Sequence, residues 1–342
     1  MDIFFYHSYN LDLLNLLNIV NGSPHYKNLY PQVFAEFGQP LSNDSKIILQ
    51  QVSQALDSSM ISPPIAFGIS IIPQFDKEPL LELLLDQERF LAAVEQYEPR
   101  LMAQKDQMFA LFQILAPVVQ ELEALGFREF WLTECLPIIE DRLDQVEALF
   151  LQSPLSSVFH ELFADTDLPE DLDIYFCALN GGNGVRLAMH TPVVDISFTT
   201  EKIFDFALHE FFYHSLIKPE AQRVMKSLET DLFLQLAFEK SQSLTGIKTI
   251  TEYVQENVNA AYKSYLLYKG GLMADPIEFL QTYQQGAMIL AVILTDHLIW
   301  DGLLSNSMLS DLEAWMTTQP LGRLMELYKQ ALERAGKPLG DL

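Results

Sequence analysis

The stretch Asp173-Ile174-Tyr175-Phe176-Cys177-Ala178-Leu179 is rich in aromatic and β-prone residues, and it predicts a β-strand. Residues 185–190 and 193–198 follow it closely and have the character of two further short strands. We therefore expect a small β-sheet in this part of the chain.

A glycine-rich segment, Asn180-Gly181-Gly182-Asn183-Gly184, follows the first of these strands. Its glycines permit positive φ angles, which tight turns require. A glycine-rich segment can also cradle phosphate, but such a loop joins a strand to a helix and is followed by a lysine. Neither condition holds here, so the segment predicts a hairpin turn.

Helices are expected on both sides of the strand region, because apolar residues recur there every three or four positions. Before it they are expected at residues 11–20, 43–56, 78–95, 101–125 and 128–152, with Pro137 able to kink the last. After it they are expected from Glu201 to before Pro219, and at 220–242, 251–268, 276–303 and 308–335. Prolines bracket residues 65–72, for which we expect a strand or an extended connection.

These elements predict an α+β fold that is predominantly helical, with the small sheet directly before the helix that begins near Glu201. A mainly helical region at 1–168 and a second region at 169–342, which holds the sheet and further helices, are expected to pack as one unit. With 342 residues and 49% hydrophobic content, the chain can bury a large core.

Composition also bears on partners and compartment. The net charge of −25 argues against binding to nucleic acid and against docking on anionic membranes. Cys135 and Cys177 lie in apolar stretches and are expected to be reduced, buried thiols, as in a cytoplasmic protein. We find no signal peptide, and the apolar run 286–294 is too short to span a bilayer, so a buried helix is expected there.

The helix that follows the strands carries His209-Glu210-Phe211-Phe212-Tyr213-His214. In zinc peptidases two histidines on one helix face bind Zn²⁺, and the glutamate between them handles a proton. The usual motif has two residues between the glutamate and the second histidine, whereas this one has three. The usual spacing leaves the two rings roughly 40° apart around the helix, and this spacing leaves them roughly 140° apart. Both rings can reach one metal only if the helix is locally underwound, for example by a π-bulge.

Zinc hydrolysis needs three protein ligands, an open coordination position and a base. The sequence suggests His209 and His214 as two ligands and Glu210 as the base. The third ligand should come from a neighbouring helix, and Glu256 is the best candidate because Ala260 and Ala261 would let that helix approach closely. Glu252, one turn earlier, is the second choice.

A developing oxyanion would need a hydrogen-bond donor in addition to the metal. His297 and Tyr262 are placed first among the candidates. The others are Tyr213, Tyr265 and Tyr283. A peptide substrate would be expected to lie along an exposed strand edge, at 185–190 or 193–198.

The residues from Ala207 to Pro219, with the motif at their centre, resemble an uncharacterised bacterial domain family of gluzincin-type zinc metallopeptidases. Members of that family have a His-Glu-Phe-x-His-Ser motif followed shortly by proline, and this chain has one extra residue before the second histidine. The segments around Glu256 and residues 8–26 are also similar to that family. The resemblance implies zinc ligation by His209, His214 and Glu256, with Glu210 as general base. Dipeptidyl peptidase III also has three residues between Glu and His.

We therefore expect a cytoplasmic zinc-dependent peptidase that acts on a peptide or protein substrate. One alternative is a catalytically inactive protein with a peptidase fold, which serves as a binding or scaffold protein because the extra residue turns His214 away from the metal. Another is a structural zinc site with four protein ligands. The sequence does not predict the oligomeric state.

Overall fold

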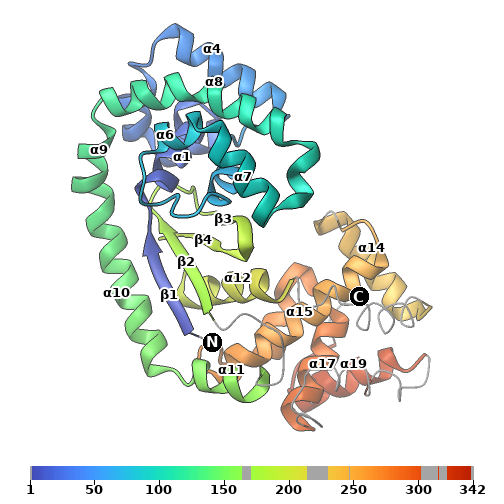
Figure 1. Cartoon of the computed structure of the whole chain (residues 1–342). Helices are drawn as coiled ribbons and strands as arrows, with labels where there is room; N and C mark the ends of the chain where they lie inside the picture. The colour runs from blue at the N-terminus through green and yellow to red at the C-terminus, as the bar shows by residue number, and fades with distance from the viewer. Residues whose placement is uncertain are drawn as a thin grey trace. The chain divides into compact units, whose positions relative to one another are not determined.

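The computed structural model describes residues 2–163, 171–213, 230–245, 247–301, 315 and 322–339 (Figure 1). The fold is α+β and predominantly helical, with one small mixed sheet, as the sequence predicts. The chain divides into two compact units, each built from separate stretches. The sheet unit comprises Phe4–Glu147 and Asp173–Phe198. The motif unit comprises Met1–Ile3, Ala148–Leu172 and Thr199–Leu342. This division does not coincide with the boundary expected after residue 168.

The sheet unit is made of the following elements. Its strands are β1 (Asp2–His7), β2 (Asp171–Cys177), β3 (Gly184–Arg186) and β4 (Pro192–Asp195), the first two of which begin in the motif unit. Its α-helices are α1 (Tyr9–Val20), α2 (Pro24–Leu29), α3 (Pro31–Val33), α4 (Asn43–Ala55), α5 (Ser62–Ser70), α6 (Leu80–Leu85), α7 (Gln87–Tyr97), α8 (Lys105–Ala124), α9 (Phe127–Phe130) and α10 (Leu136–Gln152). Short 3-10 or π-helical turns are η1 (Phe34–Gly38), η2 (Pro99–Ala103), η3 (Trp131–Cys135) and η4 (Ala188–His190).

The strand order is β1-β2-β4-β3, which corrects the prediction of a hairpin at Asn180. β4 lies between β2 and β3, pairing with β2 in parallel and with β3 in antiparallel register. The loop after β2 therefore crosses to the edge of the sheet instead of joining neighbouring strands. Gly181 and Gly182 have φ angles of 69° and 72°, so the predicted need for glycine is confirmed. The sequence analysis did not predict β1.

α1 is the central helix of the sheet unit, because all of its residues are buried. Its buried polar side chains are satisfied by other segments of the unit. Asn10 donates to the backbone oxygens of Phe75 and Glu78 at 2.6 and 2.7 Å, and Asn18 accepts from the backbone nitrogen of Ile61 at 2.7 Å. These bonds allow a helix with an amphipathic sequence to be buried on every side.

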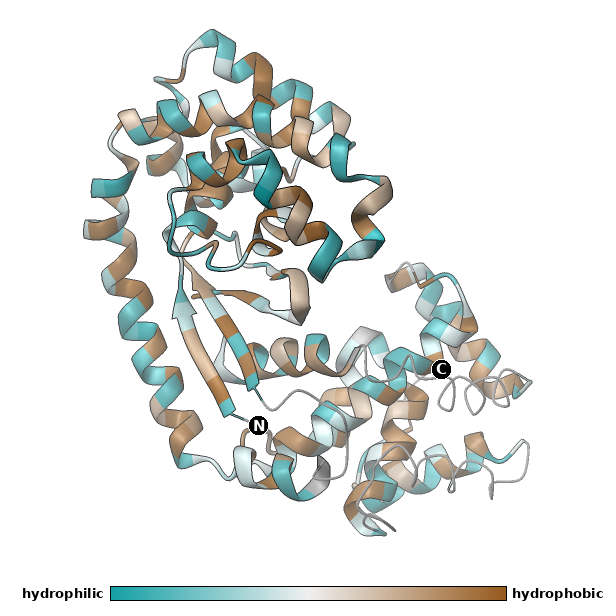
Figure 2. Cartoon of the chain, in the orientation of Figure 1, coloured by the Kyte–Doolittle hydropathy of each residue, from teal (hydrophilic) through white to brown (hydrophobic). Residues whose placement is uncertain are grey.

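Two proline-containing segments differ from the prediction. The segment expected to be extended at 65–72 belongs mainly to helix α5, so that prediction was wrong. The prolines of α5 lie in its first turn, where the backbone N–H has no helical partner to lose. Pro137 likewise lies at the start of α10, directly after the π-helical turn η3. Alternating hydrophilic and hydrophobic bands run along α10, as its amphipathic sequence requires (Figure 2).

Apart from the beginnings of β1 and β2, the described elements of the motif unit are all helices. They are α11 (Leu155–Phe163), α12 (Thr200–Tyr213), α14 (Leu232–Thr245), α15 (Ile250–Lys269), α16 (Pro276–Thr282), the 3-10 turn η6 (Tyr283–Gly286), α17 (Ile289–Trp300) and α19 (Leu324–Arg334). α15 is the centre of this unit and packs against both α12 and α17. The helix expected at 276–303 is interrupted, since Gln285 and Gly286 have positive φ angles of 54° and 78°. α17 is almost wholly buried, as predicted.

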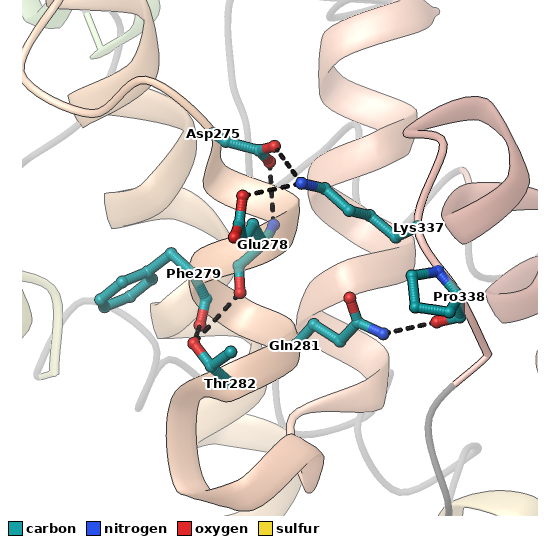
Figure 3. A network of polar contacts seen from close by, with 7 residues as sticks. All are labelled: Asp275, Glu278, Phe279, Gln281, Thr282, Lys337 and Pro338. Atoms are coloured by element: carbon teal, nitrogen blue, oxygen red, sulfur yellow. Dashed lines mark hydrogen bonds and ion pairs between the residues drawn. The ribbon is translucent and has the colours of Figure 1, made fainter.

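The chain after α19 is tied to α16 by a small polar network (Figure 3). Lys337 Nζ lies 2.8 Å from Asp275 Oδ2 and 2.7 Å from Glu278 Oε2. Gln281 donates to the backbone oxygen of Pro338 at 2.6 Å. Asp275 also caps α16 by accepting from the backbone nitrogen of Glu278. The same carboxylate therefore caps α16 and binds Lys337 of the segment after α19.

The two cysteines and the apolar run 286–294 were both expected to be buried. Cys135 and Cys177 are free and buried, as predicted. Of the helices the structure describes, none is by itself long and apolar enough to cross a membrane. One pair, α8 with the segment Phe127–Gln152, has the length and composition for a crossing only when taken together, and it is bent by 65°.

Candidate functional site

Helices α12 and α15 supply the side chains of the candidate site. Thr199 caps α12 by accepting from the backbone nitrogen of Lys202 at 3.3 Å. α15 begins with a capping box, in which Thr249 and Glu252 each accept from the other's backbone nitrogen. The carboxylate of Glu252, the second choice as a metal ligand, is therefore engaged at the start of its helix.

His209 and Glu256 face each other across the two helices. The Nε2 atom of His209 lies 3.8 Å from Oε2 of Glu256. Both side chains are mostly buried, with 23% and 20% of their surfaces exposed. The structure thus brings together the first histidine of the motif and the glutamate that the sequence placed on a neighbouring helix.

Asn259, one turn after Glu256, contacts the same histidine from the other side of the ring. Its Nδ2 donates to the backbone oxygen of His209 at 3.1 Å and lies 3.3 Å from the ring atom Nδ1. Asn259 is completely buried, and its Oδ1 has no hydrogen-bond partner among the residues that the structure describes. One amide therefore contacts both the backbone and the ring of His209.

A buried ion pair continues these contacts along the same two helix faces. Lys263 Nζ lies 2.9 Å from Asp205 Oδ1, and only 1% of the lysine side chain is exposed. Because Asp205 precedes His209 by four residues and Lys263 follows Asn259 by four, the helices run antiparallel at this contact. We call these five residues, Asp205, His209, Glu256, Asn259 and Lys263, the polar seam.

The electrostatic environment of the seam is set by its burial and by nearby carboxylates. Burial raises the pKa of Glu256 to about 7, Lys263 lowers it, and Glu210 and Glu252 raise it. Burial lowers the pKa of Lys263, but Asp205 and other neighbours outweigh this effect and raise it above its ordinary value. Lys263 is therefore a charged lysine, and burial is the main reason that the pKa of Glu256 is raised.

Glu210 belongs to this group through its effect on Glu256, although it does not form part of the seam itself. His214 lies outside the described residues. α12 is a regular α-helix as far as Tyr213, so any underwinding of the kind that the motif requires is not found within Thr200–Tyr213. Within the described part of the chain, no group of three or more His, Cys, Asp or Glu side chains could hold a metal ion.

The two residues placed first as oxyanion donors, His297 and Tyr262, have different neighbours. His297, on α17, lies 2.8 Å from Asp301 Oδ2, and its ring stacks on Trp315 with 5.0 Å between the ring centroids. Only 2% of Tyr262 is exposed, and its ring packs on Phe212 with 6.3 Å between the ring centroids.

The other tyrosine candidates have separate roles as well. The Tyr283 ring lies 5.1 Å from Lys263 Nζ, so this tyrosine borders the polar seam. The pKa of Tyr265 is raised by burial and by Glu161 of α11. For Tyr213 the structure describes the backbone only.

An imidazole and a carboxylate are ordinary zinc donors, and they fit the motif. Two ligands at about 2.1 Å from one ion can be at most about 4.2 Å apart, and the 3.8 Å between Nε2 and Oε2 lies within this limit. A ring that binds metal through Nε2 carries its proton on Nδ1, which then needs an acceptor. Asn259 could provide its Oδ1 as that acceptor only after a half-turn of its amide.

Asp205, Asn259 and Lys263 were not among the residues predicted for the site. Their positions relative to the motif residues offered a signal, because Asp205 precedes His209 by one turn and Asn259 follows Glu256 by one turn. Comparisons of the whole chain with protein-family models, curated proteins and solved structures found no match. The candidate site therefore rests on its own residues.

Proposed function

We propose that this chain is a zinc-dependent peptidase that hydrolyses peptide bonds of a peptide or protein substrate in the cytoplasm, and that it belongs with the gluzincin-type peptidases that its motif resembles. His209, His214 and Glu256 would hold the ion, and Glu210 would be the general base. The observation that carries the proposal is the approach of His209 Nε2 to Glu256 Oε2, 3.8 Å apart on two different helices.

A zinc ion at this point would lower the pKa of a bound water towards neutrality. Glu210 would accept the proton of that water and pass it to the leaving amine. Burial is the main cause that raises the pKa of Glu256 to about 7, and a bound cation would offset the cost of ionising this buried carboxylate. The seam ion pair of Asp205 and Lys263 would fix α12 against α15, and with it the position of His209 relative to Glu256.

The test is metal analysis of the purified chain together with peptide hydrolysis. We expect one zinc ion per chain, lost in the His209→Ala and Glu256→Ala variants. Glu210→Gln should retain the metal and lose hydrolysis by a factor of at least about 10². His25→Ala is a matched control, because this exposed histidine lies in the sheet unit and should retain both zinc and activity.

The proposal would be wrong if the folded wild-type chain bound no stoichiometric zinc when the metal is supplied. Equal hydrolysis by wild type and Glu210→Gln would also remove Glu210 from its assigned role. Either result can be obtained without knowing the natural substrate, because a library of short peptides serves as the activity probe.

A second candidate function is a scaffold or binding protein with a peptidase-like fold and no turnover. The regular helical geometry of α12 up to Tyr213 favours it, because an α-helix that continued unchanged would point His214 roughly 140° away from His209. On this alternative, the Glu256→Ala variant should have the same metal content as wild type, namely none.

A further inference from the structure

The amide of Asn259 meets His209 in a way that selects one of the two neutral forms of the imidazole ring. In a neutral histidine one ring nitrogen donates and the other accepts. An amide NH₂ group can only donate, so the contact of Asn259 Nδ2 with Nδ1 makes Nδ1 the acceptor. The ring proton is then on Nε2, which faces Glu256 at 3.8 Å.

A second hydrogen bond, to the backbone of His209, stabilises the same orientation of the Asn259 amide. Nδ2 also donates to the backbone oxygen of His209 at 3.1 Å, so both amide hydrogens are used on one residue. In return Oδ1 is buried and has no hydrogen-bond partner among the described residues, so its desolvation is not compensated there. A buried acceptor without a partner, one half-turn away from Nδ1, is the feature that requires an explanation.

We propose that Asn259 is a positioning residue that controls which nitrogen of His209 carries the proton. With Nδ2 towards the ring, the proton is on Nε2 and this atom has no lone pair to offer a metal. With the amide turned over, Oδ1 accepts from Nδ1–H and the lone pair of Nε2 points towards Glu256. This inference rests on the proposed function for its consequence, metal binding, but the control of the ring proton is independent of it.

A half-turn of the Asn259 amide exchanges one hydrogen bond for another. It gives Oδ1 a partner but removes the bond from Nδ2 to the His209 backbone oxygen and brings two oxygens together there. The metal-free chain therefore keeps Nδ2 towards the ring, and binding of zinc must include the turn. Asn259 acts in this way as a brake on metal binding.

The decisive substitution is Asn259→Asp, which replaces the donor beside Nδ1 with an obligate acceptor. Nitrogen-15 chemical shifts of the His209 ring, measured without metal at a pH well above the ordinary histidine pKa, show which nitrogen is protonated. We expect an unprotonated Nδ1 in wild type and a protonated Nδ1 in Asn259→Asp. Zinc alone, titrated into both proteins, should bind the variant about 10–100 times more tightly.

Two further variants keep the test independent of any general loss of stability. Asn259→Ala removes the donor without burying a charge, and the ring should then populate both tautomers and give intermediate shifts. Asn257→Asp is the matched control, because Asn257 is also fully buried in α15 but bonds Tyr253 and Ala291 instead of His209. Its ring shifts for His209 should equal those of wild type.

The outcomes separate this inference from the proposed function. Identical protonation of His209 in wild type, Asn259→Asp and Asn259→Ala would overturn the role of Asn259. The expected change in ring protonation with no zinc bound by any variant would leave that role standing and reject the peptidase proposal. Zinc affinity that is unchanged or weaker in a folded Asn259→Asp, with the ring protonation changed as expected, would reject the brake.

Discussion

At the scale of single residues, Asp12 shows how one buried carboxylate can organise a unit. Trp131 Nε1 donates to its Oδ2 at 2.9 Å, and the backbone nitrogens of Ala178 and Leu179 donate at 3.3 and 3.0 Å. The carboxylate thus joins α1, the π-helical turn η3 and the loop after β2. A buried charge is tolerated here because three donors surround it.

The pH dependence of stability should reveal this carboxylate. Burial raises the pKa of Asp12 to about 6, while its hydrogen bonds lower it. The folded chain therefore binds the Asp12 proton more tightly than the unfolded chain does, and between the unfolded pKa and about 6 the contribution of Asp12 to stability falls as pH rises. Relative to Asp12→Asn, wild type should lose on the order of 2–3 kcal/mol between pH 4 and pH 7.

Denaturant unfolding of both proteins at several pH values measures that difference. The exposed Asp44 provides the control, since the Asp44→Asn variant should follow wild type at every pH. A difference between wild type and Asp12→Asn that is constant with pH would show that the Asp12 pKa is not raised by folding.

At the scale of elements, the contact of α12 with α15 depends on a buried ion pair. Lys263 is 1% exposed, lies 2.9 Å from Asp205 and has the Tyr283 ring 5.1 Å from its Nζ. Breaking a buried pair by removing one partner leaves an uncompensated charge, whereas removing both costs much less. The seam is therefore sensitive to single substitutions and tolerant of paired ones.

We expect Lys263→Met to lower the free energy of unfolding by about 3–5 kcal/mol. The double variant Asp205→Asn with Lys263→Met should recover more than half of that loss. Lys269→Met, in the exposed last turn of the same helix, should change stability by less than about 0.5 kcal/mol. Additive effects of the two seam substitutions in chemical denaturation would contradict direct coupling between these side chains.

Sequence patterns predicted the elements better than their partners. α1, α4, α15 and α17 follow from strong apolar periodicity, which is a local property. α5 was missed because its prolines suggest a break, although the first turn of a helix accepts them. The parallel pairing of β2 with β4 could not be foreseen, since the order of strands is decided by contacts between distant segments.

The same distinction holds for the candidate site. His209 and Glu210 were proposed because a motif identifies them in one dimension, and Glu256 was proposed because Ala260 and Ala261 would let its helix approach closely. Asn259 and Lys263 were missed because their contacts are with residues of the opposite helix, which spacing along the sequence indicates only weakly. The candidacy of His297 was based on chain position alone, and its contacts with Asp301 and Trp315 give it another setting.

At the scale of the whole molecule, the charge is strongly unbalanced, with 46 acidic and 21 basic residues. Self-repulsion among like charges destabilises a compact chain and is screened by salt. The melting temperature should therefore rise with added NaCl, with most of the rise complete by roughly 0.15 M, where the Debye length is about 8 Å. Differential scanning calorimetry measures this, with an uncharged osmolyte as control. A melting temperature that falls as NaCl is added would show that attractive surface pairs dominate.

The two units interleave along the chain, and this has a consequence for biosynthesis. Most of β2 and all of β4, the two central strands of the sheet, come from Asp173–Phe198, which follows the Ala148–Leu172 part of the motif unit. A nascent polypeptide that has emerged only as far as Phe163 therefore holds helices α1 to α11 and strand β1, but it lacks β2, the strand that pairs with β1. The sheet unit is therefore expected to complete its fold only after the chain has been synthesised beyond Phe198.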